Sequence, residues 1–223
     1  MTMLDLTRFC FVDSDGVSYP VLAQPFHRGR YTIATDHCIL VRVPRRDGGE
    51  DDTGPDTAHL EMQIVREGLS PLPDVQLPTL KTCGKCQGIG KVIPCECAAF
   101  DDPCEACSFM RGVPAYEPDE NACICGHCLG RKVAYPIGAS VYLTPVLAVD
   151  PRYYALLAQL PGIRVDLSVD STSEDVVRGV SFTFDGGDGT VMPLLTSPAE
   201  NAPYVAPTAR PEVYAELLPG EAF

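Results

Sequence analysis

The sequence predicts an α+β fold: an antiparallel sheet with two helices on one face, interrupted by an irregular cysteine-rich module. Short segments in which apolar and polar residues alternate occur on both sides of that module, as expected of half-buried strands. One amphipathic helix with clear start and stop signals precedes three of these segments. Nine of the eleven cysteines lie between Cys83 and Cys128, which sets this stretch apart from the rest of the chain.

The first part of the chain predicts one short helix followed by three strands. Apolar residues between Leu4 and Cys10 recur at helical spacing and indicate the helix. Three apolar segments are expected to form the strands: 21–26, 31–35 and 38–43. Turn residues at 27–29 and 36–37 separate them.

The last third predicts the order strand, helix, strand, strand, strand. Asp150 is a typical N-cap, and Pro151 fits the first helical position. Apolar residues continue at helical spacing to Leu160, and the Pro-Gly pair at 161–162 ends the helix. Alternating segments predict the strands: 141–143, 163–170, 180–184 and 190–195. A turn is expected at 185–189.

These segments divide the chain into four consecutive regions. They are 1–80, which ends in an acidic, Pro-rich connector at 46–80; the cysteine-rich module at 81–132; the second set of strands at 133–195; and a Pro-rich tail at 196–223 with an amphipathic segment at 211–218. The two parts that flank the module are expected to form one sheet with the helices on one face. The module is therefore interpreted as an insertion.

The composition excludes several classes of protein. With 17 Lys and Arg against 30 Asp and Glu, the formal net charge is −13, which opposes binding to phosphate backbones, so nucleic acid is not the favoured partner. The apolar runs are far shorter than the roughly 20 residues of a membrane-spanning helix. The first residues lack the basic and apolar segments of a signal peptide. We therefore expect a soluble, cytoplasmic protein without membrane contact.

The cysteine spacing predicts metal binding. Clustered C-x-x-C and C-x-C pairs without an export signal favour a metal site over a disulfide framework, with thiol exchange as the competing interpretation. The segment Cys83-Gly84-Lys85-Cys86-Gln87-Gly88-Ile89-Gly90 has the pattern C-x-x-C-x-G-x-G, and Cys125-Gly126-His127-Cys128-Leu129-Gly130 matches all but its last glycine. These glycines allow a tight turn whose amides point at the thiolates.

Both segments resemble the knuckles of DnaJ-type cysteine-rich domains, in which the outer pairs share one zinc ion and the inner pairs another. The ligands that the resemblance implies for the first zinc ion are Cys83, Cys86, Cys125 and Cys128. Those for the second are Cys104, Cys107 and two of Cys95, Cys97 and Cys123. Chain order favours Cys95 and Cys97, which leaves Cys123 as the alternative ligand. No J-domain His-Pro-Asp triplet is present, so co-chaperone activity does not follow.

Two other segments resemble bacterial sliding clamps, the processivity factors of DNA polymerase. Residues 31–40 are similar to their strand-turn-strand signature, and 182–195 to their carboxy-terminal strand pair. A clamp domain consists of two β-α-β-β-β units, so the resemblance implies one such domain with the zinc module between its halves. The first strand of the first unit is not visible, and His37 follows Asp36 where the clamps have glycine. The combination also resembles phage and prophage proteins of unknown activity, which implies a phage source and the host cytoplasm.

Residues of catalytic type form no known constellation, so we expect no enzyme activity. A site closed by four thiolates has no open position for water and is structural. The Asp-His pair at 36–37 and the Gly-rich segment at 185–189 are interpreted as turns, and Cys10 and Cys38 as core residues. His127, inside the second knuckle, is expected to face solvent rather than to bind metal.

Charge is expected to separate the module into two ends. Basic residues flank the outer knuckles: Lys81, Lys85, Lys91, Arg131 and Lys132. Seven acidic residues lie between Glu96 and Glu120. The basic end either contacts nucleic acid or balances the negative charge of the metal site, and the second interpretation is favoured. Four apolar residues either contact a partner or form a local core: Phe109, Met110, Val113 and Tyr116.

These observations predict a non-enzymatic, zinc-binding interaction protein of phage origin. It is expected to dock on a host or phage protein through its acidic surface or its zinc module. One alternative is a clamp-like accessory factor of DNA replication, for which DNA binding that weakens steeply with salt would be the sign. The other is a thiol-redox or chaperone-type protein, for which the sign would be reduction of a model disulfide by the zinc-loaded chain.

Overall fold

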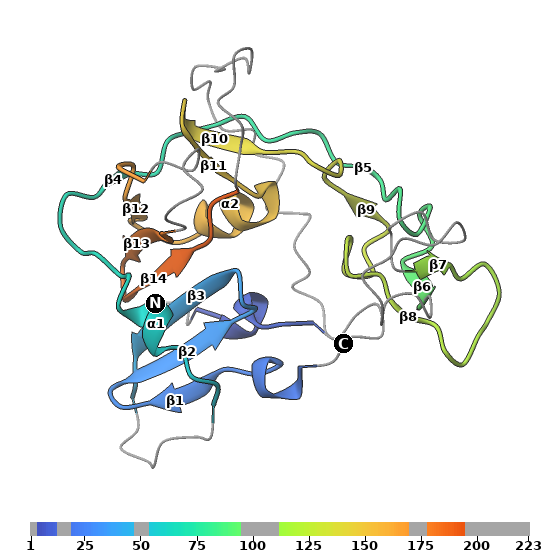
Figure 1. Cartoon of the computed structure of the whole chain (residues 1–223), viewed down its shortest axis with the longest axis horizontal. Helices are drawn as coiled ribbons and strands as arrows, with labels where there is room; N and C mark the ends of the chain where they lie inside the picture. Colours follow the sequence, from blue (N-terminus) through green and yellow to red (C-terminus); the bar gives the residue numbers. More distant parts are fainter. Residues whose placement is uncertain (1–3, 13–18, 47–53, 95–111, 170–177, 195–223) are drawn as a thin grey trace.

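The computed structural model describes residues 4–12, 19–46, 54–94, 112–169 and 178–194 (Figure 1). It is an α+β protein with mostly antiparallel sheets and few helices, as the sequence predicted at this level. The largest sheet has seven strands in the order β1-β2-β3-β14-β13-β12-β4. These strands are β1 (Phe26–Arg28), β2 (Tyr31–Thr35), β3 (Ile39–Pro44), β4 (Ser70–Pro71), β12 (Arg164–Val165), β13 (Val180–Phe184) and β14 (Gly187–Val191). The predicted tail at 196–223 lies outside the described residues.

The main core lies between this sheet and helix α2 (Pro151–Leu157). Along β3, Ile39 and Val41 belong to the same buried cluster as the side chains of α2. Leu40, between them, packs instead with Phe26 in a second cluster. Because successive side chains of a strand point to opposite faces, this alternation shows that both faces of the sheet are covered.

The helices are short, and two of them lie on the same face. The Asp150 carboxylate accepts a hydrogen bond from the Arg152 amide at 2.7 Å, so α2 begins where the sequence predicted. It ends at Leu157 rather than at Leu160. The first predicted helix is a single 3-10 turn, η1 (Leu6–Phe9), and Phe9 joins the cluster that α2 covers. Within the described ranges no helix is long and apolar enough to cross a bilayer.

The predicted strand at 21–26 is wrong. Pro20–Leu22 form a second 3-10 helix, η2, and β1 begins only after Pro25. Proline has no amide hydrogen to donate to a ladder, which prevents a regular strand in this segment. The strand β1 includes two of the three residues predicted as a turn, and Gly29, with φ of 53°, makes the turn into β2.

The predicted connector at 46–80 supplies part of the fold. Helix α1 (Ala58–Glu61) lies over the second face of the sheet, where Leu60 and Ile64 pack against the cluster of Phe26 and Leu40. Strand β4 forms the sheet edge beside β12. Both elements are too short to give a periodic pattern, which explains why the sequence did not predict them.

In the last third of the chain, the strands differ in length from the predicted ones because of local hydrogen bonds and turn geometry. Strand β12 has only two residues of the predicted strand at 163–170. The Asp166 carboxylate accepts hydrogen bonds from the amide and the hydroxyl of Ser168, and this turn ends the strand. The turn predicted at 185–189 has only two residues, because Gly186 adopts φ of 106° and β14 begins directly after it.

The cysteine-rich module lies beside the sheet domain and forms two small sheets of its own (Figure 1). Strand β5 pairs with β9, and β6 pairs with both β7 and β8. These strands are β5 (Lys81–Thr82), β6 (Lys91–Pro94), β7 (Gly112–Pro114), β8 (Cys123–Ile124) and β9 (Val133–Ala134). A hairpin of β10 (Val141–Thr144) and β11 (Leu147–Val149) leads from the module to α2, and β11 was not predicted.

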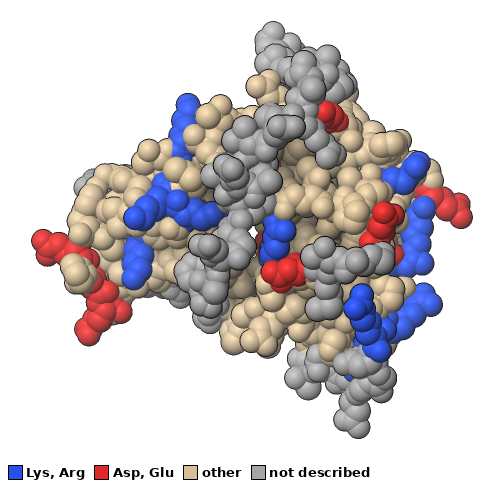
Figure 2. Space-filling model, turned by 180° about the vertical axis from the view of Figure 1, so that it is seen from behind, with Lys and Arg blue, Asp and Glu red and all other residues tan. Residues whose placement is uncertain are grey.

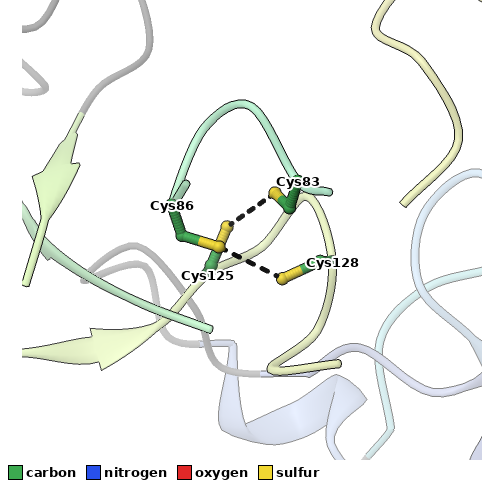
Figure 3. Close-up of side chains that lie close together, drawn as sticks. All are labelled: Cys83, Cys86, Cys125 and Cys128. Carbon is green, nitrogen blue, oxygen red and sulfur yellow. Dashed lines mark hydrogen bonds between the residues drawn. The ribbon is translucent and has the colours of Figure 1, made fainter. Parts of the chain in front are cut away.

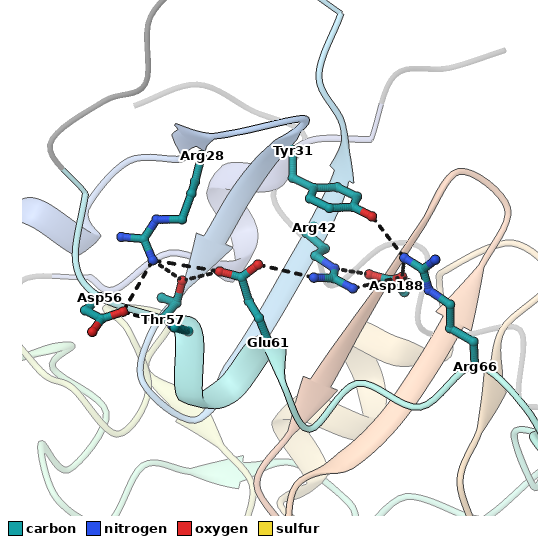
Figure 4. A network of polar contacts seen from close by, with 9 residues as sticks. Arg28, Tyr31, Arg42, Asp56, Thr57, Glu61, Arg66 and Asp188 are labelled. Carbon is teal, nitrogen blue, oxygen red and sulfur yellow. Dashed lines mark hydrogen bonds and ion pairs between the residues drawn. The ribbon is translucent and has the colours of Figure 1, made fainter.

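A network of ion pairs holds α1 against the sheet (Figure 4). Asp188 of β14 is buried and pairs with Arg42 of β3 and with Arg66, whose Nε donates to Asp188 Oδ2 at 2.8 Å. The other side of the Arg42 guanidinium donates to Glu61 of α1 at 3.2 Å. Glu61 also lies 3.8 Å from Arg28 of β1. The network therefore links β1, β3 and β14 to the segment that the sequence predicted as a connector.

Candidate metal centre

Four cysteines from two separate segments meet inside the module (Figure 3). Cys83 and Cys86 lie in the first knuckle, between β5 and β6, and Cys125 and Cys128 lie in the second, between β8 and β9. Each is at most 1% exposed, and their sulfur atoms all lie within 4.8 Å of one another. The structure thus brings together the set that the DnaJ-type resemblance implied for the first ion.

The sulfur geometry fits a metal ion and does not fit disulfides. The Sγ atoms of Cys83 and Cys125 are 3.8 Å apart, and those of Cys86 and Cys128 are 3.6 Å apart. A disulfide requires about 2.05 Å. In a tetrahedral thiolate site with metal–sulfur bonds of about 2.3 Å, neighbouring sulfurs are about 3.8 Å apart. These two separations match that value, and the remaining sulfur pairs lie within 4.8 Å.

The two knuckles make reciprocal contacts at a constant offset in the chain. Cys83 and Cys125 are 42 positions apart in the chain, as are Cys86 and Cys128. The Cys83 amide donates to the Lys132 carbonyl at 2.9 Å, and the Cys125 amide donates to the Gly90 carbonyl at 3.0 Å. The two donor residues are therefore 42 positions apart, and so are the two acceptor residues. Each knuckle thus holds the first cysteine of the other in place, so one knuckle alone cannot form the site.

Backbone amides surround the sulfur atoms. The Gly90 amide lies 3.2 Å from the Cys86 sulfur, and this contact with other hydrogen bonds outweighs burial and lowers the pKa of the Cys86 thiol. Burial raises the pKa of Cys128 to about 11 and also raises that of Cys125, although neighbouring amides partly oppose the shift. A bound cation is therefore needed to ionise all four thiols, and its binding releases protons.

Gly90 is required where the two knuckles touch. Its φ is 88°, and a Cβ at this position would lie 2.7 Å from the carbonyl oxygen of Gly130. Lys132 takes the corresponding place in the second knuckle and adopts φ of 70° although it is not glycine. The second motif therefore makes the same turn without its last glycine, but the backbone of Lys132 is strained there.

Replacing Lys132 by glycine is expected to stabilise the metal-loaded chain. A left-handed conformation costs a residue with a Cβ roughly 1–2 kcal/mol, and glycine removes this strain. The measurement is the denaturant midpoint of the metal-loaded protein. Lys132→Ala is the control, since it removes the charged side chain and keeps the Cβ. Equal midpoints for the two variants would contradict the assignment of backbone strain.

The remaining predicted ligands do not join this cluster or lie outside the described residues. The latter are Cys95, Cys97, Cys104 and Cys107. Cys123 begins β8, is half-buried, and its thiol donates to the Val92 carbonyl at 3.5 Å. His127 does not bind the cluster, but it was wrongly expected to face solvent: it is half-buried, with Nε2 3.1 Å from the Tyr135 carbonyl oxygen.

The segment Asp36-His37-Cys38 serves as a turn. Asp36 Oδ1 accepts from the amides of Cys38 and Ile39 at 2.9 Å, and Oδ2 accepts from the Tyr153 hydroxyl at 2.8 Å. Cys10 is buried in the core as predicted, whereas Cys38 is exposed, because β3 begins only after it. The hydrogen bonds of the Asp36 side chain therefore stabilise the turn and link it to Tyr153 of α2.

No family model matches this chain, and neither a curated protein nor a solved structure matches it. The interpretation of the metal centre therefore depends on the residues and contacts described above.

Proposed function

We propose that the chain is a non-enzymatic interaction protein whose module is held together by zinc. The observation that carries this proposal is the closed set of four buried cysteines, which leaves no coordination position for water or substrate. Four thiolates in tetrahedral arrangement suit zinc among the common metals. A second zinc ion, bound by Cys104 and Cys107 with two of the three other cysteines, remains part of the proposal.

The acidic end of the module is the proposed docking surface for a protein partner. A hollow of about 560 Å³ is lined by Tyr116, Glu117, Asp119, Glu120 and Lys91 among others. Tyr116 is 68% exposed, and its hydroxyl donates to Gln87, next to the ligand Cys86. Val113, by contrast, is half-buried in β7. A metal-fixed loop that displays an aromatic residue among carboxylates suits a partner with a basic surface.

The sheet domain supports a clamp-like scaffold within this proposal. In chain order, β11, α2, β12, β13 and β14 follow the pattern β-α-β-β-β, and η1 with β1 to β3 follows most of it. The strand predicted at 141–143 became β10, which pairs with β11 in a separate two-stranded sheet and does not join the large sheet. The helices on the sheet carry only Arg8 and Arg152 as basic residues, whereas clamps line their hole with Lys and Arg. We therefore propose that the scaffold is kept for docking, with phage origin and a cytoplasmic site of action as expectations of the same proposal.

Affinity capture with Tyr116→Ala tests the proposal. We expect the variant to lose the partner that the intact chain captures from host lysate, because the main exposed aromatic group of the hollow is gone. Zinc content and melting temperature are expected to stay unchanged. Val113→Ala is the matched control and should retain the partner. Capture that is unchanged in Tyr116→Ala, or lost together with zinc, would contradict the proposed docking surface.

A further inference from the structure

Aromatic and aliphatic side chains from three segments form a surface patch near the start of β3. Tyr19 is 44% exposed, and its ring packs edge to face against the rings of Phe11 and His37, at centroid distances of 5.0 and 5.3 Å. Val12, which follows Phe11, and Val21, two positions after Tyr19, are 37% and 56% exposed. We call these five residues the aromatic patch.

Backbone hydrogen bonds fix the segments of the patch relative to one another. The Phe11 amide donates to the Leu22 carbonyl at 3.0 Å, and the Leu22 amide donates to the Tyr19 carbonyl at 2.8 Å. His37 adopts φ of 76°, and its amide donates to the Thr35 hydroxyl at 3.2 Å. The patch is therefore formed before any ligand arrives, which lowers the entropy cost of binding.

The described chain leaves the large sheet at the turn that carries His37. Directly after β14, the Met192 amide donates at 2.7 Å to the carbonyl of Cys38, the residue that follows His37. The Leu194 amide then donates to the Ala148 carbonyl at 2.8 Å, and Leu194 is the last described residue. The predicted Pro-rich tail therefore starts only a few residues from the aromatic patch.

One part of the tail matches the aromatic patch in chemistry. Residues 198–207 contain three prolines as well as Tyr204 and Val205, and Glu200 is their only charged residue. The patch likewise contains no Lys, Arg, Asp or Glu, whereas Figure 2 shows most of the charged side chains of its view toward the two ends of the molecule. Residues 208–223 carry four charged side chains, which would meet no opposite charge within the patch.

We propose that the aromatic patch is a docking surface for proline-rich chain, and that residues 198–207 occupy it in the same molecule. Prolines favour the extended polyproline conformation, which loses little entropy on docking and is recognised by aromatic side chains. At about 3.1 Å per residue in that conformation, the chain from Leu194 to Pro203 spans up to about 28 Å. An attached segment has an effective concentration in the millimolar range, so even a weak contact is occupied. A proline-rich partner then has to displace the tail.

Photo-cross-linking of the full zinc-loaded chain tests this inference. Val21 is replaced by the photoreactive residue p-benzoylphenylalanine, and mass spectrometry locates the cross-links. We expect cross-links to residues 198–207 with a yield that does not depend on protein concentration, because the contact is intramolecular. Adding Tyr19→Ala should lower this yield by roughly fivefold or more, since it removes the central ring of the patch.

The matched control carries the photoreactive residue in place of Met62, which is 81% exposed at the end of α1 and lies outside the patch. This control should give little cross-linking to the tail. Absence of cross-links from position 21 to the tail, or equal yields from positions 21 and 62, would overturn the inference. Cross-links between isotope-labelled and unlabelled chains would instead assign the patch to a second copy, and cross-links to residues 208–223 alone would assign it to the other part of the tail. The Tyr116 docking surface takes part in none of these outcomes, so the two proposals fail separately.

Discussion

Replacing Cys125 by serine is expected to abolish metal binding at the four-cysteine site and to unfold the module. Cys125 is fully buried and its sulfur lies 3.8 Å from that of Cys83. Structural zinc sites in small domains supply apparent free energies of about 10–16 kcal/mol, and these small two- and three-stranded sheets contain few other buried apolar residues. The seven-stranded sheet has its own core and should keep its unfolding transition. Metal analysis and thiol alkylation of the native protein measure the effect.

Cys123→Ser is the matched control, two residues before Cys125 at the start of β8. The Cys123 thiol donates to a carbonyl and does not belong to the cluster, so this variant should keep the ion bound by the other four cysteines. If Cys123 completes a second site, only that second ion should disappear. Retention of the first ion in Cys125→Ser, or its loss in Cys123→Ser, would show that the ligand set is wrong.

Asp188→Asn is expected to destabilise the sheet domain by about 3 kcal/mol, because it removes the buried carboxylate of an ion pair. The loss lies at the lower end of the range for buried pairs, since Glu61 remains as a second carboxylate partner of the Arg42 guanidinium. The side chains of Asp188 and Arg42 are only 7% and 11% exposed. Arg66 loses the same partner, so the segment between α1 and β4 should also detach from the sheet. Denaturant unfolding gives the change in free energy, and amide exchange shows the loosening of that segment.

Asp56→Asn is the control within the same network. Asp56 lies 3.6 Å from Arg28, but its side chain is 86% exposed, and exposed ion pairs contribute about 0–1 kcal/mol. The two substitutions therefore make the same chemical change in buried and exposed surroundings. Similar losses of stability in both variants would contradict the role assigned to the buried pair.

Elements with strong local signals were predicted well. Strand β2 covers the residues predicted from their alternation, and α2 begins at the predicted cap. Elements that depend on distant partners were not predicted. The β4 strand has two residues and exists because β12 offers it an edge, and Glu61 is oriented by arginines from β1 and β3. Sequence periodicity contains no information on such partners.

The metal centre was predicted from spacing, but the reciprocal contacts of its knuckles were not. Paired C-x-x-C motifs with a glycine two positions further on indicate two knuckles, and the resemblance supplied their pairing. The cross-contacts of Gly90 and Lys132 became visible only in the structure, because the sequence has lysine where the motif has glycine. The common offset of 42 residues is the signal that aligns Lys132 with Gly90.

X-ray absorption at the zinc edge, on the purified full chain with native mass spectrometry of the same sample, tests the central claim most directly. We predict at least one tightly bound zinc per chain, two if the inner cysteines form a second site, with four sulfur neighbours at about 2.3 Å and no oxygen in the first shell. A metal-free folded chain with disulfides would contradict the account, and so would a zinc ion with an oxygen ligand in place of one of the four sulfurs.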